Sequence, residues 1–484
     1  MNKAVTRTTS WLLAAPLLLL SMATWAGTPH ASYTLDVQID PVTHKLEVST
    51  DIKLPENYAG QTLEFLLTDA VEIVASEPAV KQLPKDDSKG FTGINGSSVE
   101  VADDSPTARY QVQLPPGSTS LHLTYRGTVN FTLGDEKEQY TRGFRSTAGI
   151  IGPEGIFLAG SSLWYPYFGN DLLNFKMSVN APEGWHLISQ GNGTSRDEAG
   201  MSSWDSGGAV DEIYLVGGPL VRYAEPAGAV EAEVYLHEPD DALAKKYLVA
   251  TAQYLEMYRN LIGPYPYNKF ALVENFWETG YGMPTFTLLG PQIIRFPFIL
   301  TSSYPHEILH NWWGNSVFVD YESGNWCEGL TAYMADHLIQ EQYGRGAPYR
   351  RDTLKKYRDF VKEDRDFPLT EFRSRHSAAT EAIGYGKTLM GFHMLRLQLG
   401  DEQFKQGLAR FYRNNRGKKA SFADIQTELE AVSGQDLSKF FEQWVEWTGA
   451  PNLVVRKVKV KQSGDTWTVR GKLAQIQDGQ IYQL

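Results

Sequence analysis

Hydrophobic and polar positions alternate along the first part of the chain, from about residue 32 to residue 223. The pattern is clear at residues 35–39 and 121–125, where every second residue is apolar. Clusters of Gly, Pro, Asp and Ser, such as Pro115–Ser118, interrupt the runs at intervals typical of turns. A period of two is typical of strands with one buried face, so this part is predicted to be a large antiparallel β region.

The period changes near Asp240. Apolar residues from Leu243 to Leu261 recur three and four positions apart, and Gly263 followed by proline closes the segment. This spacing predicts a helix. From there to about residue 449 most of the chain is predicted to be helical, except a strand at Phe270–Val273 and the glycine-rich loop after it.

Alternation returns beyond Pro451. It predicts a strand at Leu453–Val460, a turn at Ser463–Asp465, a second strand around Trp467–Val469 and a last strand at Ile481–Leu484. Two or three short strands make a poor independent domain. Either they dock on the rest of the molecule, or a C-terminal part is missing from this chain.

The first 26 residues have the pattern of a removable export signal. Lys3 and Arg7 give a positive start, Trp11–Trp25 is apolar, and small residues precede Gly27. An uncleaved membrane anchor is the alternative, although the apolar stretch is short for a membrane span. The chain is therefore expected to be exported, to a periplasm or the outside, with tethering by an uncleaved signal as the less favoured case.

The composition of the chain excludes some classes of protein. A chain of 484 residues suggests two to four domains, and its net charge of −12 argues against nucleic-acid binding, which needs clustered Lys and Arg. After the signal no apolar run is long enough for a membrane span, so the mature chain is expected to lack one. Cys327 is the only cysteine and forbids an internal disulfide, which in an exported chain fits a bacterial periplasm.

The sequence H-E-I-L-H at residues 306–310 is the central chemical signal. On a helix, His306 and His310 lie four residues apart on one face, so both imidazoles can reach one zinc ion. Glu307 lies beside the first ligand and is predicted to be the general base of a metallopeptidase.

Local signals agree with a helix here. Ser302 or Ser303 can cap its start, Pro305 is tolerated in a first turn, and Gly314 suits its end.

Glu328 is the predicted third ligand of one Zn²⁺ ion. It opens a segment that has no helix breaker until Gly344. This segment is predicted to be a second helix packed beside the first. Two histidines and one glutamate leave a fourth position open to water, which distinguishes a catalytic zinc site from a structural one.

The neighbouring residues have competing interpretations. Cys327 could be a soft ligand, but at a helix start it points about 100° away from the next residue, so buried filler is favoured. Asp336 either orients a ligand histidine or is a solvated surface residue. His337, His376 and His393 lack partners at ligand spacing and are expected to be ordinary histidines.

These motifs resemble the aminopeptidase N, or membrane alanyl aminopeptidase, family of zinc peptidases of the gluzincin type. The resemblance is carried by H-E-I-L-H-N-W-W-G-N at 306–315 and by Glu328-Gly329. Further landmarks are Gly263–Tyr267, Trp164–Pro166 and Phe441–Pro451.

The resemblance covers the chain from about Tyr33 to its end. It implies a multidomain α+β fold, divided into a signal at 1–26, a saddle-like antiparallel β domain at 27–223, a mostly helical thermolysin-like catalytic domain at 224–449, and strands of a partial β-sandwich at 450–484. The family also uses a tyrosine to stabilise the tetrahedral intermediate. Tyr385, in G-Y-G-K, matches that position; without the resemblance it would read as packing.

The chain departs from the family pattern in two places. The spacer between His310 and Glu328 is one residue short. In the family's G-A-M-E-N loop a glutamate binds the substrate's α-amine, and here that loop lies within 280–285 with Pro284 at the position of the glutamate. An acid before Trp164–Pro166 is also hard to place, the nearest being Glu154.

Substrate contacts are accordingly expected from the loop itself and from a nearby acid. The predicted residues are Gly280, Gly282, Met283 and Glu278, with Glu274 as another candidate for the missing carboxylate.

Zinc-dependent hydrolysis of peptides follows as the expected function, most simply removal of N-terminal residues. Two alternatives stay open at this point. If no acid replaces the missing glutamate, the enzyme could be an endopeptidase acting on longer or blocked peptides, because an unpaired ammonium in a closed pocket is costly. The third possibility is a zinc-stabilised binding or scaffold protein without catalysis. Oligomeric state cannot be read from the sequence.

Overall fold

The computed structural model describes residues 30–84, 90–96, 98–99, 106–135, 145–169, 171–194, 197, 200–362 and 365–483. The predicted signal at residues 1–26 lies outside them. Within the described ranges, no helix has the length and apolar character needed to cross a membrane.

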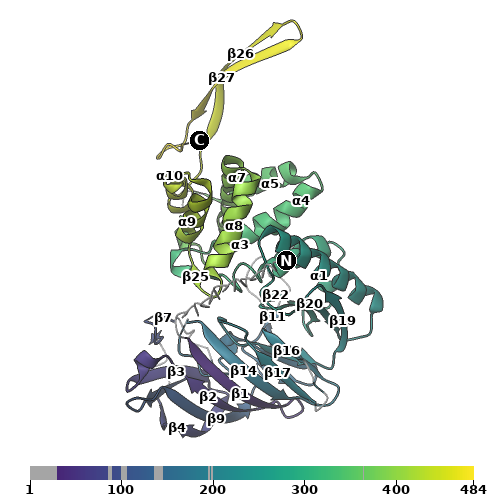
Figure 1. The fold of residues 1–484 in the computed structure, drawn as a ribbon, viewed down its shortest axis with the longest axis vertical. Coiled ribbons are helices and arrows are strands. Elements are labelled where there is room, and N and C mark those ends of the chain that lie inside the picture. Colours follow the sequence, from purple (N-terminus) through teal and green to yellow (C-terminus); the bar gives the residue numbers. More distant parts are fainter. Residues whose placement is uncertain are drawn as a thin grey trace, which may run out of the picture.

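The N-terminal region is built from several β-sheets, at the bottom of Figure 1, whose strands share one buried apolar core. Its largest sheet has the order β16-β17-β14-β1-β2-β9-β4. Every neighbouring pair in it is antiparallel except β1 and β14, which run parallel. Its strands are β1 (Ala31–Asp40), β2 (Lys45–Lys53), β4 (Val71–Glu77), β9 (Ser120–Thr128), β14 (Leu173–Asn180), β16 (Asn192–Thr194) and β17 (Met201–Asp205).

Smaller sheets complete this region. A four-stranded sheet has the order β12-β13-β18-β15, and a three-stranded sheet has the order β3-β8-β5. Their strands are β12 (Ile150–Gly152), β13 (Gly155–Leu158), β15 (His186–Ile188), β18 (Leu215–Gly218), β3 (Thr62–Thr68), β5 (Val80–Gln82) and β8 (Thr107–Gln113). Two short pairs are β6 (Phe91–Thr92) with β7 (Ser98–Val99), and β10 (Gly134–Asp135) with β11 (Arg145–Ser146).

The second region, here named the catalytic region after the sequence prediction, combines a five-stranded sheet, in the order β19-β20-β21-β23-β22, with a set of helices. The predicted boundary at residue 223 falls inside β19, so the catalytic sheet begins slightly earlier, at Val221. The strands are β19 (Val221–Ala227), β20 (Val230–Leu236), β21 (Lys269–Glu274), β22 (Gly280–Met283) and β23 (Phe286–Leu289), with the short pair β24 (Phe318–Val319) and β25 (Lys419–Ala420).

The helices cover this sheet and extend away from the N-terminal region (Figure 1). Helix α1 starts as the sequence predicts, because the side chain of Asp240 accepts the backbone N–H of Leu243. The helices are α1 (Asp241–Leu261), α2 (Ser303–Leu309), α3 (Cys327–Ala332), α4 (Leu338–Gln342), α5 (Gly346–Phe360), α6 (Ala378–Glu381), α7 (Thr388–Leu399), α8 (Asp401–Asn415), α9 (Phe422–Ser433) and α10 (Ser438–Phe441).

A buried apolar cluster joins the two regions. Phe157 and Val216, from the four-stranded sheet, pack with Tyr235, Val273 and Phe286 of the catalytic sheet. All five are less than 10 % exposed. Apolar burial of this kind is the main favourable term in folding, and interiors are close-packed, so the cluster fixes the loop before β18 relative to β22.

The C-terminal strands form a hairpin, β26 (Leu453–Ser463) with β27 (Thr466–Gln475), that projects from the rest of the molecule (Figure 1). The predicted turn between the strands is confirmed. The predicted strand at Ile481–Leu484 is wrong for its described part, residues 481–483, which form no strand. Tyr482 instead packs on Trp444 and Trp447, and its O–H donates to the carbonyl of Thr448.

Candidate metal centre and active site

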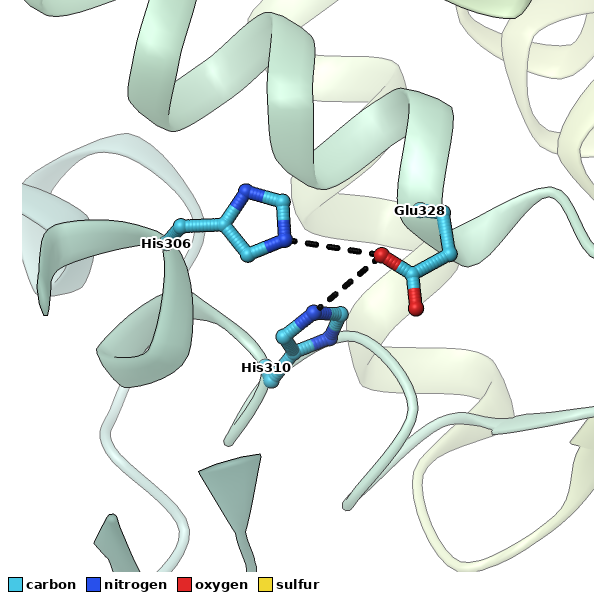
Figure 2. Close-up of side chains that lie close together, drawn as sticks. All are labelled: His306, His310 and Glu328. Carbon is cyan, nitrogen blue, oxygen red and sulfur yellow. Dashed lines mark ion pairs between the residues drawn. The ribbon is translucent and has the colours of Figure 1, made fainter. Parts of the chain in front are cut away.

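The three predicted metal ligands converge on one point (Figure 2). His306 comes from α2, His310 directly follows it, and Glu328 comes from the first turn of α3. Glu328 Oε2 lies 3.4 Å from His306 Nε2 and 3.6 Å from His310 Nε2. Within the part of the chain that the structure describes, these three side chains are close enough together to hold one metal ion.

Helix α2 is shorter than the sequence suggests. Ser302 occupies the position before its start, but its hydroxyl donates to the carbonyl of Phe298 and makes no capping bond. Pro305 lies in the first turn as expected. The helix ends at Leu309, ahead of Gly314, so His310 holds its place through the turn that follows the helix.

The ligand geometry fits zinc. An ion coordinated tetrahedrally at about 2.0–2.2 Å needs ligand atoms about 3.3 Å apart, close to the two separations observed. The far nitrogens are held as well: His306 Nδ1 lies 2.9 Å from Asp336 Oδ2, and His310 Nδ1 lies 3.0 Å from the carbonyl oxygen of Trp313. These bonds place each proton on Nδ1 and leave Nε2 to bind an ion.

Asp336 therefore orients a ligand histidine, which was one of its two sequence interpretations. A π-helical segment at Tyr333–His337 lies between α3 and α4. The extra residue of such a bulge changes the rotation of the helix, and Asp336 lies within it.

Electrostatic interactions link the three ligand side chains. Burial lowers the pKa of His306, but the carboxylate of Asp336 outweighs burial and raises that pKa to about 10. Burial raises the pKa of Glu328, but the charge of His310 and the hydrogen bonds from both histidines bring it well below its usual range. A metal ion would take the place of protons on the imidazoles, as expected for a binding site of this kind.

Cys327 is not positioned as a ligand. Its Sγ lies 3.4 Å from Nδ1 of His310, the nitrogen that faces away from Glu328. The thiol is buried and also contacts Thr331. Its interpretation as buried filler agrees with this geometry.

Glu307 lies against the loop of β22. A Cβ added at Gly282 would overlap its Oε2, so the absence of a side chain there gives the carboxylate its place. Burial raises the pKa of Glu307. Asn311, which follows the end of α2, ties this segment to the loop, because its Oδ1 accepts the N–H of Thr285 at 2.8 Å and the O–H of Tyr265 at 3.2 Å.

Tyr385 lies at the metal centre, in a second π-helical segment, Ala382–Lys387. Its ring stacks with that of His306 at a centroid separation of 6.4 Å, and the guanidinium of Arg375 lies 5.5 Å from its centroid. Burial and then the charge of Glu328 raise the pKa of Tyr385, so its O–H stays protonated as a donor.

One cavity of about 590 Å³ contains the metal ligands, Glu307 and Tyr385. It is also lined by residues that the sequence did not suggest. From the N-terminal region these are Asp211, Glu212 and Tyr214, and from the catalytic region they include Tyr321, Lys356 and Arg375. The segment before β18 reads as an ordinary turn in the sequence, and only the packing of the two regions brings it to the cavity.

The predicted substrate-binding residues divide into two groups. Gly280 and Gly282 line the cavity, whereas Met283 is buried beneath the loop. Glu278 is not among the lining residues; its Oε1 accepts the N–H of Gln292 at 2.8 Å. Glu274 is also engaged elsewhere, pairing with Arg295 at 2.5 Å and accepting the N–H of His237 at 2.9 Å.

Comparisons with known proteins agree with the geometry. Residues 301–444 match the model of the peptidase family M1 domain. The chain is 20 % identical to Aminopeptidase 2 of Candida albicans over 94 % of its own length and 51 % of that protein. It is 25 % identical to Aminopeptidase N of Lactococcus lactis over 30 % of this chain and 18 % of that one. It thus spans about half, or less, of the length of these curated relatives.

Solved structures show the same fold. An M1 zinc metallopeptidase from Deinococcus radiodurans superposes with a TM-score of 0.64 and 20 % identity, covering 87 % of this chain and 94 % of the other. The predicted multidomain α+β architecture is confirmed.

Two histidines and a glutamate from neighbouring helices, with a second glutamate beside the first histidine, form the arrangement of a gluzincin-type zinc site. The M1 peptidase match at residues 301–444, together with the aminopeptidase relatives, supports an M1 zinc metallopeptidase of the aminopeptidase N type. The family implies one zinc ion, and His306, His310 and Glu328 are the residues here that fit it.

Proposed function

We propose that this protein is a zinc-dependent aminopeptidase, which removes residues from the free N-terminus of peptides. The observation that carries the proposal is the placement of the ligand triad, Glu307 and Tyr385 on one cavity. The aminopeptidase names of its relatives support removal from the N-terminus over internal cleavage.

Each residue has a defined role in peptide hydrolysis. When bound, the zinc ion supplies Lewis-acid polarisation of the scissile carbonyl and lowers the pKa of a water molecule. Glu307 accepts the proton of the attacking water and passes it to the leaving amine. The Tyr385 O–H donates a hydrogen bond to the developing oxyanion, an interaction that forms mainly in the transition state.

A mass-spectrometric digest tests the proposal. Matched peptides with free and N-acetylated ends are incubated with the zinc-loaded protein, with and without a chelator. Ladders that lose one residue at a time from free peptides only, and only without chelator, are expected. Chelator-sensitive internal cuts in both peptide sets would establish an endopeptidase instead.

Glu307→Gln is the matched catalytic control. It should abolish turnover, by roughly 10²–10⁴-fold or more, while zinc content stays at one ion per chain. Full activity in this variant would contradict the role of Glu307. Absence of any chelator-sensitive turnover in the unsubstituted protein would favour a zinc-stabilised binding protein.

Export is a second part of the proposal. The positive start and apolar stretch of residues 1–26 support removal of a signal and a periplasmic or secreted location. N-terminal sequencing of the protein recovered from a bacterial host tests it: a mature start at Gly27 is expected, and a retained Met1 would contradict cleavage.

A further inference from the structure

We propose that the buried Lys269 is a positioning residue for peptide hydrolysis, which joins two sides of the cavity and fixes β22 beside Glu307. This role rests on the proposed function, because it concerns the rate and the substrate binding of the same site. Lys269 is the first residue of β21 and is only 5 % exposed. It is not one of the residues that line the cavity, so it acts through the residues that it holds.

The Lys269 ammonium contacts both regions of the fold. Its Nζ donates to the carbonyl oxygen of Ser189 at 2.7 Å and to Oγ1 of Thr285 at 3.0 Å. Ser189 directly follows β15 in the N-terminal region, whereas Thr285 lies in the turn between β22 and β23. One side chain therefore ties the end of an N-terminal strand to a turn of the catalytic sheet.

This turn needs support because Thr285 has an unfavourable backbone conformation. Its φ of 68° lies in the left-handed region, which β-branched residues rarely adopt. A residue persists there only when the surrounding structure fixes it. Thr285 is fully buried, and its hydroxyl accepts the hydrogen bond from Lys269. Its N–H donates to Asn311 Oδ1 at 2.8 Å, and its carbonyl accepts the N–H of Ala271 at 2.9 Å.

Asn311 connects the same turn to the metal centre. It directly follows His310, and its Nδ2 donates to the carbonyl of Ile308 at 3.0 Å, at the end of α2. The Tyr265 hydroxyl lies 3.2 Å from Asn311 Oδ1 and 2.9 Å from the carbonyl oxygen of Lys269. The backbone of Lys269 is therefore linked to the segment that carries two metal ligands.

The turn also sets the place of β22. As the edge strand of its sheet, β22 pairs only with β23 and depends on the turn that joins them. It brings Gly280 and Gly282 to the cavity, and a Cβ at Gly282 would overlap Glu307 Oε2. A shift of Thr285 would therefore move β22 against the proposed general base.

Ser189 extends the link to the other side of the cavity. Its hydroxyl donates to the carbonyl of Tyr214 at 2.6 Å, and the N–H of Tyr214 donates to Gln190 Oε1 at 3.0 Å. Ser189 and Gln190 are fully buried, whereas Tyr214 lines the cavity. Lys269 therefore reaches a residue of the N-terminal region that faces the substrate space.

Packing alone does not account for a lysine at this position. Among the described residues, no acid forms an ion pair with Lys269, and the two acceptors of its ammonium are neutral. Burial lowers its pKa to about 8, although the charge of Glu233 opposes this effect. A methionine of similar length would avoid the cost of burying a charge, but it could not hold the two acceptors.

Matched substitutions at both ends of one hydrogen bond test the role. Lys269→Met removes the donors and keeps the length of the side chain. In the zinc-loaded full chain it should lower kcat about tenfold and raise KM several-fold for a tripeptide with a free N-terminus, because both sides of the cavity lose a tie. Thr285→Val removes only the acceptor on the turn, so kcat should fall with KM nearly unchanged. Thr285→Ser keeps the hydroxyl and should retain the reference kcat.

A double-mutant cycle shows whether the two residues act together. Lys269→Met combined with Thr285→Val should lower kcat no more than Lys269→Met alone, since both changes remove the same contact. Zinc content should stay at one ion per chain in every variant. If Lys269→Met does not fold, Thr285→Val and Thr285→Ser still test the contact, because neither removes the buried lysine.

Glu428→Gln is the control for a general loss of stability. Glu428 is buried on α9, where it pairs with Arg410 of α8 and accepts a hydrogen bond from Asn414 at 2.8 Å. This change should lower the thermal unfolding midpoint and leave kcat and KM unchanged.

Hydrogen exchange gives a measurement without turnover. Lys269→Met should speed exchange of the amides of β22 and of Tyr214, but not of α8 and α9. Glu428→Gln should speed exchange in α8 and α9 alone.

Three results would overturn the inference. They are unchanged kcat and KM in Lys269→Met, an equal fall of kcat in Glu428→Gln, and strictly additive losses in the double variant. The proposed function fails separately: if the unsubstituted chain hydrolyses no peptide, the function is wrong, whereas turnover there with unchanged kinetics in Lys269→Met rejects only the positioning role.

Discussion

The two walls of the cavity differ in how the chain builds them. The helical wall holds His306, Glu307 and Glu328 on two helices that are close in sequence. The N-terminal wall presents Asp211 and Glu212 from a loop in another region of the fold. Residues that are close in sequence form the first wall. The second wall forms only when the N-terminal sheets pack against the catalytic sheet.

This difference suggests that the two walls have separate roles, one in the hydrolysis step and the other in substrate binding. In the proposed mechanism, residues of the helical wall hold the ion, move the proton and donate to the oxyanion, so their loss should reduce the rate for every peptide. Residues of the N-terminal wall line the same cavity without holding the ion, so their loss is expected to reduce peptide binding more than the rate. Substitutions on each wall can test whether the two effects are separable.

The largest of these effects is expected for Tyr385→Phe. The phenylalanine keeps the ring that stacks with His306 and Arg375, but loses the O–H donor. Removal of one oxyanion donor typically lowers kcat by about 10²–10³-fold. Steady-state kinetics should show this fall for every peptide that the protein cleaves, with KM little changed. A raised KM with kcat intact would instead assign Tyr385 to substrate binding.

A smaller effect is expected for Asp336→Ala. This change removes the acceptor of His306 Nδ1–H, so zinc affinity should fall about 10- to 100-fold, with less loss in Asp336→Asn. Competition with a metal-sensitive dye measures the affinity. Cys327→Ser is the matched control, because the thiol contacts His310 on the side away from Glu328. Equal losses in the two variants would contradict a specific role for Asp336.

The helical wall could be predicted because its residues lie within short sequence motifs. Two histidines four residues apart must share a helix face, and Glu328 opens the next helix-compatible segment. The exact form could not be predicted: α2 ends at Leu309, and a π-helical segment brings Asp336 to His306. These details depend on the tertiary packing of both helices.

The N-terminal wall could not be predicted. Proximity to the loop in sequence favours Glu274 and Glu278, but the direction of each side chain decides which groups it can reach. Glu274 points to Arg295 and Glu278 to the backbone of Gln292. Nothing in the residues around Asp211 marks them as part of a site, since their place depends on the apolar cluster that joins the two regions.

A glycine lies against a key carboxylate on each wall, which allows one substitution to be compared in two places. On the helical wall, Gly282→Ala places a methyl group where Glu307 Oε2 lies. The carboxylate is the free end of a flexible side chain and can rotate, so the thermal unfolding midpoint should stay nearly constant. The displaced base should lower kcat about tenfold for every peptide cleaved. Unchanged kcat would show that Glu307 does not need this position.

On the N-terminal wall, Gly160→Ala pushes against Glu212, the carboxylate that the Gly160 N–H holds. Glu212 must shift, while Asp211 and the metal ligands keep their places. KM for free tripeptides should therefore rise several-fold, and kcat and zinc content should stay near the reference values. Gly282→Ala should change kcat, whereas Gly160→Ala should change KM. The two variants together therefore test whether catalysis and substrate binding depend on different walls of one cavity. If Gly160→Ala lowered kcat as strongly as Gly282→Ala, the two walls would act as one unit and the separation of chemistry from selection would be wrong.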